Sequence, residues 1–234
     1  MSPDRSGGSL EPYKRDAALA AVAAEVRDGM LVGLGTGSTA AYVVREIGRR
    51  IRADGWRIQG VPTSERTAAL AREAGIPLVA LDAAPDVVLD GADQVDPSLA
   101  LIKGGGGAHA REKIVATAAR RTAIVADYTK AVPQLSGPVP LEVLPFAVPW
   151  VLRTLPERVP RAEARLRTRD GKPVMTDNGN PVIELVCGGI ENPASLGATL
   201  DVLPGIIEHG LFVRIADVVY FAGPDGIKIT QGHV

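Results

Sequence analysis

The sequence has one cysteine, Cys187, among 234 residues. One cysteine excludes an internal disulfide framework and a C-x-x-C zinc motif, and it favours a reducing compartment. The chain also lacks an uninterrupted apolar run of about 18 residues, the length that suggests a membrane-spanning helix, and its first residues contain no apolar secretory segment. We therefore expect a cytoplasmic protein without a membrane partner, in which residues 1–10 form a disordered lead.

Neither sign of charge predominates in the sequence. The 26 basic and 27 acidic side chains leave a formal net charge of -1, so no global field attracts nucleic acid or an anionic membrane. Aromatic residues make up only 4% of the chain and do not interleave with the arginines from Arg45 to Arg52, which we interpret as a solvated helix end. Nucleic acid is therefore not an expected partner, and any anionic ligand must be bound locally.

Hydrophobic residues supply 46% of the chain, enough to bury a substantial core. Short apolar segments alternate with segments of helical periodicity. The predicted strands are 30–32, 57–61, 87–90 and 122–126, and the predicted helices are 11–27, 40–47, 64–74 and 111–119. Repeated strand–helix units predict an α/β fold with a Rossmann-like, mostly parallel sheet, whose functional groups lie at the carboxyl ends of the strands.

Prolines crowd between Pro133 and Pro149 and interrupt this alternation. The segments that follow are a strand at 141–148, a short helix, a strand at 161–169, a strand at 182–186 and a helix from Asn192-Pro193 to about Leu203. They predict a smaller α+β domain inserted at about 131–206. The Rossmann-like catalytic domain then consists of 11–130 plus about 207–234.

Glycines and hydroxyl residues follow the first predicted strand, in the segment Gly33–Thr39. Glycines let a backbone approach an anion closely, and the helix that follows directs its first amide hydrogens toward it. Ser38 replaces the last glycine of a G-x-G-x-x-G motif, and the next strand ends in Thr63-Ser64 rather than in an acidic ribose ligand, so a dinucleotide is disfavoured. The segment either binds a phosphate-like anion or is a tight turn with a capping hydroxyl.

A denser group of charged residues begins at Asp90. Three carboxylates lie in 90–96, Lys103 precedes four consecutive glycines, and Glu112 follows in the next predicted helix. Four glycines cost conformational entropy that a plain connection does not require, which indicates a backbone shaped around a ligand. The alternative is a solvated acidic loop followed by a flexible hinge.

These residue types suit the interconversion of an aldose and a ketose through an enediol. The reaction needs a base that takes a proton from one carbon and returns it to the next, together with groups that polarise the neighbouring oxygens. A carboxylate can be the base and a lysine can stabilise the developing oxyanion, and such acid–base assistance is worth about 10²–10⁴ in rate. The residue types alone leave open which carboxylate does which task.

Four motifs occur between Gly33 and Asn180, in a chain whose family resemblance extends from about Tyr13 to the C-terminal strands. They are GLGTGST (Gly33–Thr39), DGADQVD (Asp90–Asp96), LIKGGGGA (Leu101–Ala108) followed by REK (Arg111–Lys113), and TDNGN (Thr176–Asn180). In type and order they closely resemble the motifs of type A ribose-5-phosphate isomerases. The resemblance implies interconversion of D-ribose 5-phosphate and D-ribulose 5-phosphate in the non-oxidative pentose phosphate pathway, without a metal or organic cofactor, by a homodimer or homotetramer.

The resemblance also implies roles for individual residues. Glu112 would be the catalytic base, Asp90 and Asp93 would bind sugar hydroxyls and assist ring opening, and Lys103 would stabilise the enediolate. The implied substrate-binding residues are Thr36, Gly37, Ser38, Thr39, Gly91, Ala92, Gly104, Gly105, Gly106, Lys130 and Arg15. Arg15 stands where the family has a lysine near the N-terminus, and Lys14 is adjacent to it.

Besides Arg15, two residues depart from the family pattern. Gln94 replaces an acidic residue, and we expect its side chain to point away from Asp90 and Asp93. His109 lies three residues before Glu112, so it could perturb the base or touch substrate, or it could be a supporting or surface residue. A metal pair with Glu112 is disfavoured, since two ligands rarely suffice.

The main alternative is a sugar-phosphate-sensing protein, because the effector domains of DeoR-type transcription regulators have a similar fold. A regulator of that type needs a helix-turn-helix, and the roughly ten residues before the first predicted helix are too few. Amino-sugar phosphate deaminases and coenzyme A transferases of the same fold group are disfavoured by the motif from Lys103 to Glu112.

Overall fold

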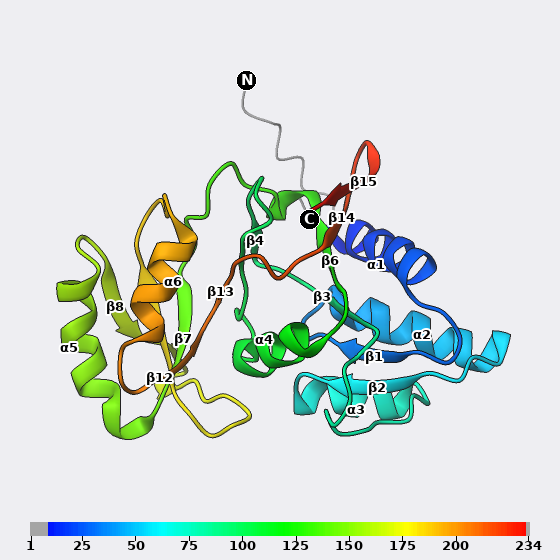
Figure 1. The fold of residues 1–234 in the computed structure, drawn as a ribbon, viewed down its shortest axis with the longest axis horizontal. Coiled ribbons are helices and arrows are strands. Elements are labelled where there is room, and N and C mark those ends of the chain that lie inside the picture. The colour runs from blue at the N-terminus through cyan, green and yellow to red at the C-terminus, as the bar shows by residue number, and fades with distance from the viewer. Residues whose placement is uncertain (1–8, 233–234) are drawn as a thin grey trace.

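The computed structural model describes residues 9–232, so the predicted disordered lead lies outside the described residues up to residue 8. The centre of the fold is a six-stranded sheet that is parallel except for the edge strand β15 (Figure 1). Its strands, in spatial order, are β15 (Gly226–Gln231), β14 (Val218–Gly223), β6 (Thr122–Asp127), β3 (Val87–Asp90), β1 (Leu31–Leu34) and β2 (Gln59–Pro62). The predicted α/β class with a mostly parallel sheet is confirmed.

Alternation along the strands decides which helix covers each face of this sheet. The helices are α1 (Glu11–Glu25), α2 (Ala40–Asp54), α3 (Glu65–Glu73) and α4 (His109–Ala118). Val87 and Leu89 of β3 enter the core formed with α1 and α2, whereas Val88 packs on the opposite face with Val115 of α4. Asp90 is two residues beyond Val88 and therefore points to the α4 face. Glu112 lies about one turn before Val115, so the two carboxylates meet.

A second, antiparallel sheet has four strands in the order β12 (Ile206–His209), β7 (Val139–Val143), β11 (Val182–Val186) and β8 (Glu163–Leu166). Its apolar face packs under α5 (Val148–Arg158) and α6 (Pro193–Asp201) in a core separate from that of the main sheet. The division into two domains stays a proposal, since this second core also contains Ala100, Ile102 and Leu211 of the proposed catalytic domain. Strand β12 crosses the proposed boundary at 207, since it still pairs with β7.

A third sheet links these parts through β13 (Leu211–Phe212), β5 (Leu101–Ile102) and β4 (Gln94–Val95). Helix α4 lies between the six-stranded and four-stranded sheets (Figure 1). The sequence did not predict β4 or β5, because a two-residue strand shows no recognisable alternation. The short elements that remain are η1 (Tyr128–Lys130), η2 (Pro145–Ala147), β9 (Thr168–Arg169) and β10 (Lys172–Pro173).

Several predicted boundaries can be compared with the structure. Asn192 caps α6 as predicted, because its side chain accepts the amide hydrogen of Ser195 at 3.0 Å. The predicted strand at 141–148 is wrong in its second half, where η2 leads into α5. Helix α4 begins at His109, two residues before the predicted start. None of the helices in residues 9–232 is long and apolar enough to cross a membrane.

Candidate active site

A cavity of about 140 Å³ lies at the carboxyl ends of β1 and β3. It is lined by Lys14, Thr36, Gly37, Ser38, Thr39, Gly91, Ala92, Asp93, Lys103, Gly104, Gly105, Gly106, Glu112 and Lys130. Of the predicted site residues, only Asp90 and Arg15 are missing from this lining. Arg15 is exposed and pairs with Asp16 at 3.3 Å, and its neighbour Lys14 faces the cavity instead.

Three buried charged side chains meet beside the cavity. Lys103 Nζ lies 2.9 Å from Asp90 Oδ2 and 3.2 Å from Glu112 Oε2, and it donates to the Gly91 carbonyl at 2.6 Å. Glu112 Oε2 makes no well-directed hydrogen bond to any residue that the structure describes. The ammonium is thus held by the protein, and the buried Oε2 of Glu112 has this ion pair in place of a hydrogen bond.

Burial and neighbouring charge set the proton affinities of this group. Burial, and after it the charge of Asp90, raises the pKa of Glu112 from 4.5 to about 8. Burial also disfavours the charged form of Lys103, but the carboxylates of Asp90 and Glu112 outweigh it and raise the pKa of Lys103 above its usual value. A permanent cation therefore lies beside a carboxyl group that titrates near neutral pH, as general base catalysis requires.

The surroundings of Asp90 differ most from the expectation, which was that this residue binds sugar hydroxyls. Only 2% of it is exposed, Oδ2 pairs with Lys103, and Oδ1 accepts the amide hydrogens of Thr36 at 3.0 Å and Gly91 at 2.7 Å. A Cβ atom at Gly35 would overlap the Asp90 carboxylate, so glycine lets the loop after β1 close over it. The carboxylate that the sequence assigned to sugar hydroxyls is thereby occupied with protein donors.

The first glycine-rich loop, Gly33–Thr39, is fixed by hydroxyl groups. Thr36 Oγ1 lies 2.8 Å from Thr63 Oγ1, 2.8 Å from Ser64 Oγ and 3.1 Å from Thr67 Oγ1. Thr39 caps α2 by position, but its side chain makes no capping hydrogen bond. The Thr39 hydroxyl and the N-terminal end of α2 are thus available to an anion in the cavity.

The second glycine-rich loop, Gly104–Gly107, is fixed by charged groups. The Gly105 amide donates to Asp93 Oδ2 at 2.8 Å. Arg167 donates through Nη1 to the carbonyls of Gly104 at 3.0 Å and Gly105 at 3.3 Å. Arg167 is a site-supporting residue that the sequence did not predict, because no local motif marks an arginine 63 positions away from its partner.

His109 is fully buried and does not line the cavity. A Cβ atom at Gly104 would lie 2.7 Å from His109 Cβ, so the histidine packs directly against the second loop. Burial lowers the pKa of His109 to about 3, which keeps the ring neutral at neutral pH. Of the roles left open for it, the supporting one fits. Gln94 points toward 136–137, where its Oε1 accepts two amide hydrogens, at 2.8 and 3.0 Å.

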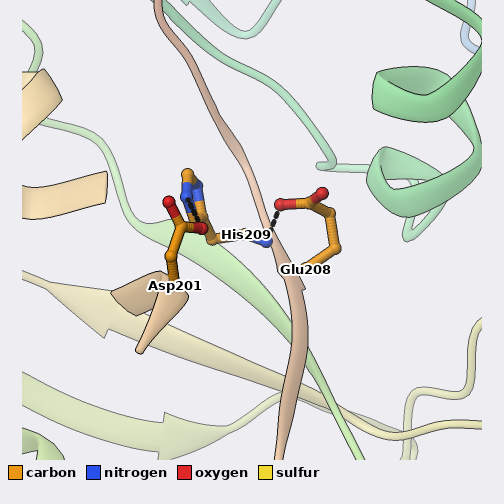
Figure 2. A group of neighbouring side chains, drawn as sticks. All are labelled: Asp201, Glu208 and His209. Carbon is orange, nitrogen blue, oxygen red and sulfur yellow. Dashed lines mark hydrogen bonds and ion pairs between the residues drawn. The ribbon is translucent and has the colours of Figure 1, made fainter. Parts of the chain in front are cut away.

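Among residues 9–232, one group of three side chains is close enough to hold a metal ion, and it lies away from this cavity. Figure 2 shows Asp201, Glu208 and His209, with His209 Nε2 3.1 Å from Asp201 Oδ1. Lys113 Nζ donates to Glu208 Oε1 at 2.6 Å and lies 3.2 Å from His209 Nδ1. Because an ammonium already neutralises Glu208, the group is interpreted as an ion-pair network between α4 and β12.

Comparison with known proteins gives one consistent family. The model of the family described as "Ribose 5-phosphate isomerase A (phosphoriboisomerase A)" matches residues 59–226. Ribose-5-phosphate isomerase A of Natronomonas pharaonis is 50% identical over 226 residues, which cover 96% of this chain and 99% of the relative. The protein of the same name from Chloroflexus aurantiacus is 50% identical over 225 residues, covering 94% and 93% of the two chains.

Solved structures agree with the sequence comparisons. Ribose 5-phosphate isomerase A from Methanocaldococcus jannaschii superposes with a TM-score of 0.90 at 41% identity, covering 95% of this chain and 100% of that one. A D-ribose-5-phosphate isomerase in complex with phospho-erythronic acid gives a TM-score of 0.91 at 39% identity, covering 96% and 100%. The predicted family is thus confirmed, and the chain belongs to the ribose-5-phosphate isomerase A family.

Proposed function

We propose that this chain interconverts D-ribose 5-phosphate and D-ribulose 5-phosphate with Glu112 as the base. The observation that carries the proposal is the cavity-lining carboxyl group of Glu112, whose pKa is about 8 and whose Oε2 lies 3.2 Å from the Lys103 ammonium. A base of this proton affinity is partly ionised at neutral pH and still binds a carbon-derived proton well enough to carry it between two atoms.

The phosphate group is proposed to bind at the first loop. The hydroxyl groups of Ser38 and Thr39 and the N-terminal end of α2 lie on one side of the cavity, and Lys14 and Lys130 line the same cavity. Hydroxyl donors, a helix N-terminus and two ammonium groups are together suited to a dianion. Binding there leaves the other end of a five-carbon sugar to extend toward Glu112.

The proton transfer is proposed to take place in the part of the cavity lined by Asp93, Lys103 and Glu112. Asp93 is proposed to bind sugar hydroxyls and to assist ring opening. Glu112 then removes the proton from C2 of the open-chain aldose, and the electron pair moves to O1, where Lys103 and the amides of the second loop stabilise the charge. Glu112 returns the proton to C1 while the O2 proton passes to O1, which leaves the carbonyl group at C2.

Asp90 is proposed to act through Lys103 rather than by touching the sugar. Its ion pair at 2.9 Å holds the ammonium beside the cavity, and its bonds to the amides of Thr36 and Gly91 tie the first loop to the end of β3. Because a buried ammonium is costly without an anion, Asp90 keeps Lys103 charged when Glu112 takes up a proton.

Conversion of ribose 5-phosphate in the presence of excess EDTA tests the proposal. The natural protein should turn over at an undiminished rate, and Glu112→Gln should bind the sugar phosphate but lose turnover by about 10²–10⁴-fold, the range for a missing acid–base group. Binding without turnover in the natural protein would instead favour the sensor function, and near-normal turnover in Glu112→Gln would remove Glu112 as the base.

Assembly and location stay predictions. We propose a homodimer or homotetramer in the cytoplasm, and exposed apolar side chains next to α5 and α6 support self-association: Phe146 in η2 is 99% exposed, and Val202, directly after α6, is 75% exposed. Light scattering of the purified protein measures the assembly directly, and a single monomeric species at micromolar concentration would contradict it.

A further inference from the structure

Arg167 reaches from the second sheet to the second glycine-rich loop. Its backbone lies between β8 and β9 and is fixed there, because its amide donates to the Val182 carbonyl at 2.8 Å and its carbonyl accepts from Val174 at 2.9 Å. The side chain is 14% exposed, and its Nε donates to Glu184 Oε1 at 2.9 Å. Because hydrogen bonds fix both its backbone and its guanidinium group, Arg167 is a rigid donor.

This guanidinium binds the carbonyl groups of two consecutive peptides. Nη1 donates to the carbonyls of Gly104 and Gly105 at 3.0 and 3.3 Å. The N–H of a trans peptide points opposite to its C=O, and residues 9–232 contain no cis peptide bond. The N–H groups of Gly105 and Gly106 therefore point away from Arg167. The bond from the Gly105 amide to the cavity-lining Asp93 carboxylate agrees with this direction.

The Gly106 amide is left without a protein acceptor in the described part of the chain. Gly106 lines the cavity, so this N–H is a donor available to a ligand oxygen. Two successive amides that point to one side of a turn form a concave binding place for an anion. Hydrogen bonding of the carbonyl to a cation also polarises the peptide group and makes its N–H a stronger donor.

The loop itself supplies one turn hydrogen bond and no side chain to hold this direction. Gly104 has a φ of 98°, and a Cβ atom there would lie 2.7 Å from His109 Cβ and 2.8 Å from Pro140 Cγ, so a side chain cannot anchor it. Consecutive glycines have access to many backbone conformations. Within the loop, the Gly107 amide donates to the Gly104 carbonyl at 3.0 Å, and the other hydrogen bonds that restrict it come from Asp93 and Arg167.

We propose that Arg167 is a positioning residue for the isomerisation: by holding the carbonyl groups of Gly104 and Gly105, it directs the Gly106 amide at the developing enediolate oxygen while the Gly105 amide stays on Asp93. The proposal rests on the proposed function, since the ligand is the oxyanion formed in that reaction. It also assigns a function to the second sheet, because Glu184 of β11 and Arg167, between β8 and β9, together support the site.

A matched pair of variants separates positioning from stability. Arg165 also binds Glu184, at 2.9 Å, but is 56% exposed and makes no hydrogen bond to the second loop. Arg167→Gln should lower kcat by roughly 10–100-fold, as expected for misplaced donors, with the KM for ribose 5-phosphate within about threefold of its natural value. Arg165→Gln should leave both constants near those of the natural protein.

A binding measurement distinguishes positioning from a purely structural role, because a general loss of structure would weaken the affinity for both ligands rather than for one. Phospho-erythronic acid carries a planar carboxylate that resembles the enediolate, whereas inorganic phosphate has only the phosphate end. Arg167→Gln should weaken phospho-erythronic acid by about tenfold or more and leave inorganic phosphate unchanged. Equal weakening of the two ligands, or a kcat equal to that of Arg165→Gln, would overturn the positioning role even if the natural protein is an active isomerase.

Arg167→Lys covers the case in which the glutamine variant does not fold. Lysine keeps the charge but cannot donate to Glu184 and to two carbonyls in the same fork geometry. Its kcat should lie between those of Arg167→Gln and the natural protein, at unchanged KM. A folded Arg167→Lys with natural kcat and natural affinity for phospho-erythronic acid would contradict the proposal. If the natural protein lacks isomerase activity, the proposed function itself fails first.

Discussion

The two glycine-rich loops of the cavity are built alike but are held differently. Each loop has a carboxylate on one amide, Asp90 on that of Thr36 and Asp93 on that of Gly105. In the first loop the Thr36 hydroxyl also lies within hydrogen-bonding distance of three other hydroxyls, whereas the second loop has a cation, Arg167, on two of its carbonyls. The difference matches the proposed ligand, whose phosphate keeps its charge throughout while charge at the other end appears only during reaction.

The comparison predicts which kinetic constant each loop controls. Donors that meet a constant charge stabilise the bound substrate and the transition state equally, so the first loop should determine KM. Donors that meet a developing charge act in the transition state alone, so the second loop and Lys103 should determine kcat. A variant contradicts this assignment if a change in the first loop alters kcat or a change in the second loop alters KM, and the largest effect is expected for Lys103.

Lys103→Met should have the largest effect after loss of the base. Removal of the ammonium takes away a donor to the oxyanion, which lowers kcat by about 10²–10³-fold. The Lys103 charge also lowers the pKa of Glu112, so without it that pKa should rise above about 8. The pH profile of kcat/KM, which needs ionised Glu112, should then shift to higher pH. A profile with an unchanged acid limb would contradict the coupling of these two groups.

The positions of both glycine-rich loops could be predicted from the sequence, because each loop is a local motif near the end of a strand. The relation of Arg167 to Gly104 could not, since it depends on how two sheets are placed. Lys14 was also not chosen over Arg15, because one residue turns a side chain about 100° around a helix and the alanine-rich α1 gives weak guidance to its phase. Burial of His109 depends likewise on packing between α4 and the second loop.

Thr39→Val tests the other half of the comparison. The shape of the side chain is nearly kept, but a hydroxyl donor to a charged phosphate is lost, which should raise KM by about 10–100-fold with little change in kcat. Thr199→Val on α6 removes a hydroxyl that bonds only to the Ser195 carbonyl and is the matched control. A fall in kcat at constant KM for Thr39→Val would show that the first loop acts on the reaction step.

The smallest expected effect is a gain in stability from loss of the base. Since the pKa of Glu112 is about 8 in the folded protein and 4.5 is its ordinary value, the folded state binds more protons between these pH values, and stability falls as pH rises through the window. Glu112→Gln should therefore be more stable than the natural protein by about 1–3 kcal/mol near pH 8.

Urea unfolding at several pH values measures this difference. The gain should be small near pH 4, where the carboxyl group is protonated in both states, and should grow toward pH 8. A gain that does not depend on pH would mean that the carboxyl group is not the cause.

The central claim is that Glu112 takes the proton from C2, and its most direct test follows that proton. Ribose 5-phosphate carrying deuterium at C2 is incubated with the natural protein and with Glu112→Gln, and the label is followed in water, at C1 of the product and in the remaining substrate. The account predicts a primary isotope effect for the natural protein, with the label leaving C2 and arriving at C1 of the product or, by exchange at the Glu112 carboxyl group, in water. For Glu112→Gln it predicts no measurable loss of label from C2, and equal rates of loss from C2 in the two proteins would contradict it.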